Sequence, residues 1–419
     1  MKTVERLVRY AQVHTDSKLN TGSRPSTPWQ IDLTYMLRDE MLEMGVSNVR
    51  ADEMGYVYGE IPATPGYEDR PAIGFIAHID TAPDFTGENV HPRVIENYDG
   101  NDIELENGRI ISAKKFTHLK DLKGDTLVVT DGTTLLGADD KAGVAVIMTF
   151  LEKLLASDMP HGKVCVCFNP DEEIGEGAWD LDVDKLGADY AYTLDGSRAG
   201  DLIYECFNAS AAVIKINGFA VHPGDSKDRM VNAVYIATQI AGMLPIGQSP
   251  RDTSGYEGYF HISTLNGGIA SAVMRITIRD FDKEKFLARE QLIRDIVNVM
   301  NMKYGEGTVT LDITEQYGNM ADEIHKHEHM IEIAKAAIRD AGLEPNILPI
   351  RGGTDGAQLT MKKGLPCPDL GEGAFAMHGP YEHASGKQME QTVEILMNII
   401  RRYAEPGSAP KRNRQGCNC

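Results

Sequence analysis

Short apolar runs alternate with helical segments along most of this chain, and polar side chains follow where two of these runs end. Pro71–Ala77 is strand-like and is followed at once by His78, and Lys163–Phe168 is followed a few positions later by Glu172 and Glu173. Strands that alternate with helices predict a largely parallel sheet covered on both faces. Such sheets bind ligands outside the carboxyl ends of their strands, and imidazole with carboxylates in that position favours a metal site for hydrolytic chemistry.

Composition and charge narrow the class of protein. A chain of 419 residues is expected to form two domains, and 42% hydrophobic with 25% charged residues is typical of a soluble globular protein. The sequence has neither an apolar run long enough to cross a bilayer nor a signal peptide, because Met1–Arg6 opens an amphipathic helix, and we therefore expect a cytoplasmic protein. The net charge of -20 argues against nucleic acid or an anionic membrane surface as a partner.

The six cysteines do not suggest the disulfide framework of a secreted protein. Cys165 and Cys167 lie in a strand-like run, where they are expected to act as small apolar residues. Cys417 and Cys419 belong to a tail, residues 406–419, for which disorder is favoured over metal binding.

The order of predicted elements changes near residue 209. Residues 1–208 and 317–405 are predicted to form the two parts of an α/β catalytic domain with a mostly parallel sheet. Residues 209–316 follow the order βαββαβ, which predicts an inserted α+β, ferredoxin-like domain that serves as a lid or pairs two protomers. Among the expected elements are the helices Gln30–Met44 (ending at Gly45), Met230–Leu244, Lys283–Tyr304 and Gln388–Tyr403, and the strands Thr126–Thr130, Ala191–Leu194, Ala211–Asn217, Gly258–Thr264, Ala272–Asp280 and Thr308–Thr314.

Residues at the predicted strand ends supply a ligand set for two metal ions. Two cations about 3.5–4 Å apart hold one water molecule between them and need a carboxylate that bridges them. Asp139 can bridge from a turn flanked by glycines. Three carboxylates with one hydroxide neutralise two dications, and this mixture of imidazole and carboxylate favours zinc, with cobalt or manganese as substitutes. The predicted ligands are His78, Asp139, Glu173, Asp195 and His378.

Two further acids are expected beside these ligands. Asp80 lies two residues after His78, so both side chains project to the same side of an extended chain and Asp80 can accept the imidazole N–H. Glu172 and Glu173 are adjacent and cannot both face one metal, so one can ligate while the other accepts a proton from the water. Each pattern also has a plainer interpretation, as a hydrogen-bonded pair, a helix N-cap or a solvated surface pair. Their joint occurrence at separate strand ends favours the metal site.

Longer segments of the chain resemble a known family. The matching segments are GFIAHIDTAPDFTG (Gly74–Gly87), LLGADDKAG (Leu135–Gly143), NPDEEIGEGA (Asn169–Ala178), YTLDG (Tyr192–Gly196), VHPG (Val221–Gly224) and RGGTDGAQL (Arg351–Leu359). They resemble the peptidase T family of cytoplasmic tripeptide aminopeptidases, within the dizinc aminoacylase and carboxypeptidase clan. The similarity extends from the first helix to about Tyr403. The dizinc pattern alone is shared with deacylases and dipeptidases.

The resemblance implies two zinc ions per chain and a role for each matched residue. It implies that His78 and Asp195 bind one zinc, that Glu173 and His378 bind the other, and that Asp139, not Asp140, bridges them. It also implies that Glu172 is the general base, that Asp80 orients His78, that His222 stabilises the oxyanion, and that Arg279 and Arg351 hold the substrate carboxylate.

Two features depart from the family pattern. Leu370–Met377 lacks the family's threonine and asparagine, and His383 stands where an aromatic residue is usual, so His383 is an alternative ligand to His378. These departures bear on the choice among peptide substrates. The alternative functions are a deacylase or dipeptidase of the same clan and a non-catalytic peptide-binding relative. The expected partners are a short peptide and, through the inserted domain, a second copy of the chain.

Overall fold

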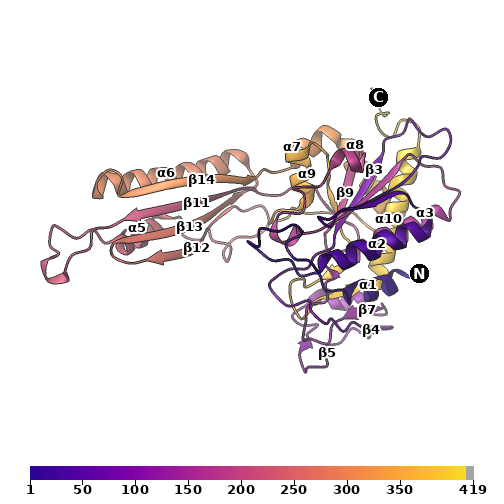
Figure 1. Cartoon of the computed structure of the whole chain (residues 1–419), viewed down its shortest axis with the longest axis horizontal. Helices are drawn as coiled ribbons and strands as arrows, with labels where there is room; N and C mark the ends of the chain where they lie inside the picture. Colours follow the sequence, from indigo (N-terminus) through magenta and orange to yellow (C-terminus); the bar gives the residue numbers. More distant parts are fainter. Residues whose placement is uncertain (412–419) are drawn as a thin grey trace. The chain divides into compact units, whose positions relative to one another are not determined.

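The computed structural model describes residues 1–411, which form two compact units (Figure 1). The first unit comprises Met1–Tyr204, Asp322–Leu348 and the chain from Thr354 onward, and the second comprises Glu205–Ala321 with Pro349–Gly353. The predicted inserted range, 209–316, falls within the second unit. Of the predicted tail, residues 412–419 with their two cysteines lie outside the described residues.

An eight-stranded sheet forms the centre of the first unit. Its strands are parallel from β8 through β3 and β9 to β16, and again between β10 and β15, while the remaining pairs are antiparallel. The predicted α/β fold with a mostly parallel sheet is therefore confirmed. In sheet order the strands are β1 (Ser47–Ala51), β2 (Val57–Ile61), β8 (Val164–Asn169), β3 (Ile73–His78), β9 (Tyr190–Leu194), β16 (Asp369–Leu370), β10 (Asp201–Ile203) and β15 (Asn346–Ile347).

Helices cover both faces of this sheet, and consecutive residues of β3 show why the strand is apolar throughout. Phe75 packs edge-on against Phe150 of α3, with ring centroids 5.1 Å apart. The next residue, Ile76, belongs to a buried cluster on the other face that includes Leu186 of α4 and Leu359 of α9. The helices of this unit are α1 (Thr3–Ala11), α2 (Gln30–Met44), α3 (Ala138–Leu155), α4 (Val183–Leu186), α8 (Glu328–Asp340), α9 (Asp355–Lys363) and α10 (Gly386–Ala404), with the short α7 (Ala321–Ile324) where the two units meet in sequence.

The predicted strand at Thr126–Thr130 forms, but outside the main sheet. Leu127–Val129 (β7) pairs antiparallel with β4 (Arg93–Ile95) on one side and β18 (His383–Ser385) on the other. With β17 (Ala374–Phe375) these strands make a separate four-stranded sheet, and β5 (Ile103–Glu104) with β6 (Ile110–Ile111) makes a small hairpin. A three-residue apolar strand has the same pattern in either sheet, so periodicity could not identify its partners.

The second unit has the predicted βαββαβ order. Its elements are β11 (Asn208–Asn217), α5 (Ala233–Met243), β12 (Tyr259–Gly267), β13 (Ser271–Asp280), α6 (Lys283–Tyr304) and β14 (Val309–Tyr317). The strands form one antiparallel sheet in the order β12-β13-β11-β14. Alternate strand residues, such as Ile214 and Ile276, pack against Ile236 of α5 and Ile293 of α6 in a single core.

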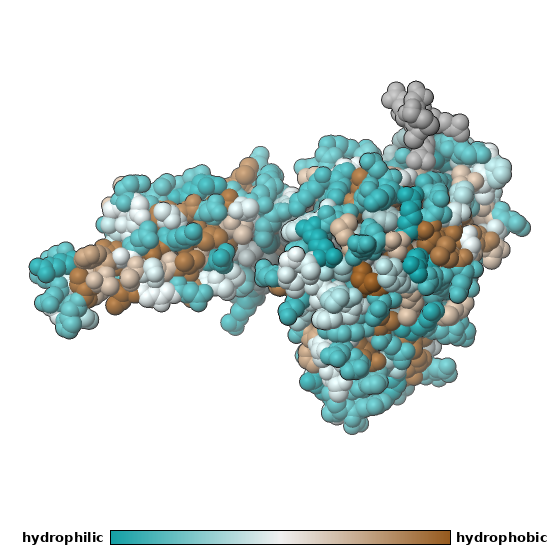
Figure 2. All heavy atoms as spheres, viewed as in Figure 1, coloured by the Kyte–Doolittle hydropathy of each residue, from teal (hydrophilic) through white to brown (hydrophobic). Residues whose placement is uncertain are grey.

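Polar residues dominate the visible surface of the protein. Hydrophilic side chains cover most of the face shown in Figure 2. Among residues 1–411, no helix combines the length and the apolar character needed to cross a membrane.

Candidate functional site

The predicted ligands come from segments that meet at one edge of the first unit's sheet. His78 is the last residue of β3, Asp195 directly follows β9, and the short 3-10 helix η2 (Glu172–Ile174) follows β8. Because β8, β3 and β9 are parallel neighbours, their carboxyl ends lie side by side. Asp139 lies in the first turn of α3, and His378 lies in the connection between β17 and β18.

Asp139 lies between the two histidines and directs one carboxylate oxygen at each. Its Oδ1 is 3.0 Å from His78 Nε2, and its Oδ2 is 3.2 Å from His378 Nε2. Asp195 Oδ1 is 3.6 Å from the same His78 nitrogen, and Glu173 Oε2 is 3.1 Å from the same His378 nitrogen. The side chains therefore form two groups that share Asp139, which is the arrangement that a bridging carboxylate needs.

The neighbouring Asp140 is also close to His78, but its oxygens are used elsewhere. Potential donor atoms of His78, Asp140 and Asp195 lie within 4.8 Å of one another, as do those of His78, Asp139 and Glu173. Asp140 Oδ2 accepts the backbone N–H of His78 at 3.1 Å, and its Oδ1 accepts the N–H of Gly143 at 3.0 Å. We therefore favour Asp139 as the shared residue and regard Asp140 as a support for the strand end.

Asp80 connects the end of β3 to the turn that carries the two glutamates. Its carboxylate accepts the backbone N–H of Glu172 at 2.9 Å and that of Glu173 at 3.2 Å. Its Oδ1 lies 3.4 Å from His78 Nδ1, whereas the backbone oxygen of Asp80 is closer to that nitrogen, at 3.1 Å. Asp80 is fully buried and contacts the imidazole of His78 mainly through its backbone oxygen and the glutamate turn through its carboxylate. The second of these contacts was not foreseen from the sequence.

The two glutamates of η2 differ in their contacts. Glu173 directs Oε2 at His378, and its buried Oε1 has no hydrogen-bond partner within residues 1–411. For Glu172, no side-chain hydrogen bond is found in the described part of the chain. Burial, with the nearby charges of Asp195 and Asp355, raises the pKa of Glu172 well above its usual value. Glu173 therefore contacts the cluster through His378, whereas the Glu172 side chain has no such contact; the roles of ligand and base stay predictions.

Burial and mutual repulsion shift the pKa values of the acids in the cluster, and hydrogen bonds to the histidines act in the opposite direction. Burial raises the pKa of Glu173 to about 8 and that of Asp195 to about 6. Burial acts in the same direction on Asp139, but hydrogen bonds to His378 and His78 outweigh it and lower the pKa of Asp139. Hydrogen bonds to Asp139 and Glu173 raise the pKa of His378 to about 11.

His383, the alternative ligand, faces away from this cluster. Its Nδ1 lies 2.8 Å from the backbone oxygen of Tyr381, and its Nε2 lies 2.8 Å from Nε2 of His118, with which it stacks. Both ring nitrogens are therefore engaged elsewhere, and of His378 and His383 only His378 contacts the cluster.

The three remaining predicted site residues belong to the second unit, and their place beside the cluster stays a prediction. His222 is exposed, and its Nδ1 accepts the N–H of Gly224 at 3.1 Å. Arg279 donates to the backbone oxygens of Ser210 and Ile278 and to the side chain of Gln316. Arg351 donates to the backbone oxygens of Gly255 and Glu257 and to the hydroxyl of Thr253. Neither guanidinium forms a salt bridge with a carboxylate among the described residues, and their role in binding an anionic ligand stays a prediction.

Sequence reasoning missed several buried acids around the cluster. The local sequence does not mark them as buried, because each has a glycine, a proline or a polar residue directly beside it. The missed residues are Asp355, Asp369, Glu372 and Glu382, each at most 3% exposed.

Comparison with known proteins gives the family. The model of peptidase family M20/M25/M40 matches residues 129–402. A peptidase T of Clostridium perfringens (strain 13 / Type A) is 47% identical over 405 residues, which cover 96% of this chain and 99% of the relative. The chain belongs to the peptidase T family. A peptidase T of Bacillus licheniformis is 45% identical over 407 residues, 96% of this chain and 99% of the relative. The predicted resemblance is confirmed, and the chain is a peptidase that acts on peptide substrates.

Two solved structures share the fold of this peptidase. The aminopeptidase PepT of Bacillus cereus superposes with a TM-score of 0.77 at 23% identity, over 96% of this chain and 98% of that one. A tripeptidase of Staphylococcus aureus superposes with a TM-score of 0.76 at 22% identity, over the same shares of the two chains.

Proposed function

We propose that this chain is a dizinc aminopeptidase that releases the N-terminal residue of tripeptides in the cytoplasm. The observation that carries the proposal is the position of Asp139, whose two oxygens face two different histidines, each with a further carboxylate beside it. Membership of the peptidase T family supports peptide hydrolysis, and the names of the relatives support a short peptide as the substrate.

The residues present fit two divalent ions. The donors are imidazole nitrogens and carboxylate oxygens, the set that zinc prefers, and the buried, unpartnered Oε1 of Glu173 needs a positive partner. We assign His78 and Asp195 to one ion, Glu173 and His378 to the other, and Asp139 to both, with cobalt or manganese as substitutes. When bound, such ions lower the pKa of water and polarise a carbonyl group.

The remaining steps belong to side chains of this protein. Glu172 accepts a proton from the attacking water and returns it to the leaving nitrogen as the C–N bond breaks, so that the products are an amino acid and a dipeptide. Asp80 holds the Glu172 turn in place. We assign to His222 the stabilisation of the oxyanion, and to Arg279 and Arg351 the binding of the substrate carboxylate, which would limit peptide length.

Substitution of Glu172 tests the assignment of the base. We expect Glu172→Gln to lower kcat by about 10²- to 10⁴-fold, the usual range for a general base, while two metal ions per chain remain bound. Glu176→Gln, on the same loop, is the matched control and should retain activity. Near-normal turnover by Glu172→Gln would refute the assignment.

A substrate screen separates the proposed activity from its rivals. The protein should release a free amino acid from tripeptides, with activity lost on chelation and restored by zinc. Cleavage of N-acetyl amino acids or dipeptides instead would identify a deacylase or dipeptidase. Saturable peptide binding without bound metal or turnover would identify a binding protein. The proposal also includes a homodimer formed through the second unit, which light scattering can test.

A further inference from the structure

Glu382 lies four residues after His378, is 1% exposed and directs its whole carboxylate at the turn before α3. Its Oε2 accepts the backbone N–H groups of Leu136 at 2.7 Å and Gly137 at 2.8 Å. Its Oε1 accepts the backbone N–H of Asp139 at 3.0 Å. One buried side chain, distant in sequence, therefore holds the backbone on both sides of the α3 start.

These three N–H groups have no intrahelical acceptor, because they precede or begin the helix. Gly137, at the N-cap position, has φ of 75° and cannot supply a side-chain cap. A carboxylate at this end is also favoured by the helix dipole. Asp140 caps the regular helix that follows, through the N–H of Gly143, and Glu382 accepts the N–H groups of the turn before it. One of these groups belongs to the residue whose side chain forms the centre of the site.

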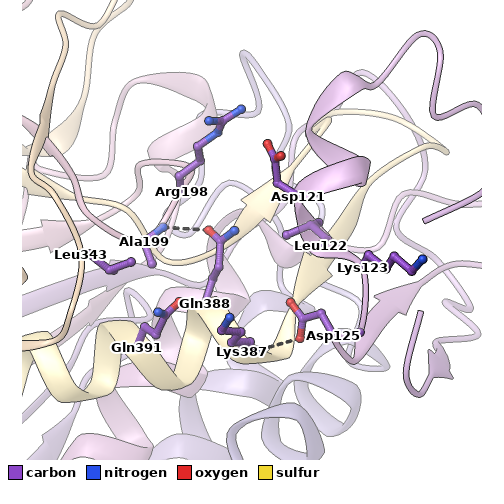
Figure 3. Close-up of a pocket in the computed structure, with 11 residues that line it drawn as sticks. Asp121, Leu122, Lys123, Asp125, Arg198, Ala199, Leu343, Lys387, Gln388 and Gln391 are labelled. Atoms are coloured by element: carbon purple, nitrogen blue, oxygen red, sulfur yellow. Dashed lines mark hydrogen bonds between the residues drawn. The ribbon is translucent and has the colours of Figure 1, made fainter. Parts of the chain in front are cut away.

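The position of Glu382 is itself fixed by the chain that follows it. The next three residues form β18, which pairs with β7 and β17. At the start of α10 the backbone N–H of Lys387 donates to Asp125 Oδ1 at 3.0 Å, and Gln388 Oε1 accepts the N–H of Ala199 at 2.9 Å, beside a small hollow (Figure 3). Glu382 is therefore followed directly by a paired strand and an anchored helix, and these elements hold its carboxylate in a fixed position.

We propose that Glu382 is a positioning residue that holds the backbone of Asp139 so that its two oxygens face two separate metal ions. An aspartate side chain has only two rotatable bonds, so its backbone position largely decides where Oδ1 and Oδ2 lie. The two oxygens lie 3.0 and 3.2 Å from different imidazole nitrogens, and a shift of the turn would disturb both contacts. The part of this inference that concerns metals rests on the proposed function, whereas the part that concerns the turn does not.

Glu382→Gln tests the inference with little change in shape. The glutamine oxygen can still accept the N–H groups of Leu136 and Gly137, but its amide then faces the N–H of Asp139, which loses its acceptor. Glu40→Gln is the matched control. Glu40 is also a buried carboxylate of the first unit, 7% exposed, but it contacts Arg6, Arg9 and Tyr10.

The first measurement is hydrogen–deuterium exchange of the metal-free protein. We expect Glu382→Gln to lose protection in peptides that cover residues 134–140, with the rest of the first unit unchanged. Glu40→Gln should leave these peptides protected. A role in overall stability alone would raise exchange throughout the unit.

The second measurement is zinc binding by calorimetric titration. Loss of a residue that orients a ligand typically weakens metal binding about 10- to 100-fold. We therefore expect the dissociation constant of the weaker zinc site to be higher by that factor in Glu382→Gln than in the wild-type protein. Glu40→Gln should bind both ions with unchanged affinity. Wild-type protection of residues 134–140 together with unchanged zinc affinity in Glu382→Gln would overturn the inference.

A second variant, Glu382→Asp, tests the same inference if Glu382→Gln does not fold. Glu382→Asp keeps the charge but moves the carboxylate away from the turn by one methylene, and it should show the same local exchange. Full protection of the turn in this variant would also count against the inference. If the wild-type protein cleaves no peptide, the proposed function fails, while the exchange experiment still decides the role of Glu382 in the turn.

Discussion

Replacing His383 with phenylalanine should make the first unit less sensitive to acid. His383 is fully buried and packs against His118 and Phe375, with ring centroids 5.0 and 5.6 Å away, while these two rings lie 4.5 Å from each other. Burial, together with the charge of His118, lowers the pKa of His383 from 6.5 to about 4, although a hydrogen bond to Tyr381 acts in the opposite direction. The folded protein therefore keeps this ring neutral at pH values where the unfolded chain protonates it.

The sign and size of the effect follow from that difference. At pH 7 the ring is neutral in both states, and below pH 6.5 only the unfolded state gains the proton, so stability falls until the folded ring titrates near pH 4. With 1.36 kcal/mol per pKa unit, this group should remove about 2 kcal/mol of unfolding free energy between pH 7 and pH 5. His383→Phe removes that contribution and keeps an aromatic ring in the cluster.

Urea denaturation followed by tryptophan fluorescence measures this change in the right part of the protein. Both tryptophans, Trp29 and Trp179, lie in the first unit. Chelator should be present at both pH values, so that metal binding does not contribute. The difference in unfolding free energy between wild type and His383→Phe should change by about 2 kcal/mol from pH 7 to pH 5. An unchanged difference would refute a buried, neutral His383.

Two further predictions concern the site and its support. Zinc binding to the metal-free protein at pH 7 should release protons, because the pKa values of about 11 for His378 and about 8 for Glu173 leave both groups protonated at that pH. The zinc affinity should therefore rise with pH. Equal calorimetric heats of zinc binding in buffers of different ionisation enthalpy would contradict this prediction. Gly177→Ala should destabilise the first unit by about 1–3 kcal/mol, because the new Cβ would lie 2.4 Å from Asp355 Oδ2 and 2.7 Å from Asn169 Nδ2; an unchanged thermal midpoint would show that this packing relaxes freely.

The long elements could be predicted from the sequence because their ends carry local signals. The helix Gln30–Met44 ends where expected, since Gly45 adopts the left-handed conformation with φ of 85° and closes the helix. The helix Lys283–Tyr304 begins after Asp282, whose side chain caps the N–H of Lys285. The order of the inserted elements and the parallel strands followed from the same kind of signal.

What the sequence could not predict depends on contacts between distant segments. Strands of two or three residues, such as Ala374–Phe375, are too short for a periodic pattern, so the small sheet was missed. The closeness of His78, Glu173 and Asp195 could be expected because each follows a predicted strand of the parallel sheet, whereas their role as metal ligands stays a prediction. The carboxylates of Asp80 and Glu382 accept backbone N–H groups of remote turns, and such contacts depend on the folded backbone, not on residue type.

The separation of the cluster residues along the chain has a consequence for biosynthesis. On the proposed ligand set, His78 is translated early, whereas His378 follows 300 positions later, in the last tenth of the 419-residue sequence. A ribosome must therefore translate the 300 positions that separate these two residues before both histidines of the cluster exist. On the proposed assignment, the catalytic centre is therefore assembled only after His378 has been synthesised and folded against Asp139.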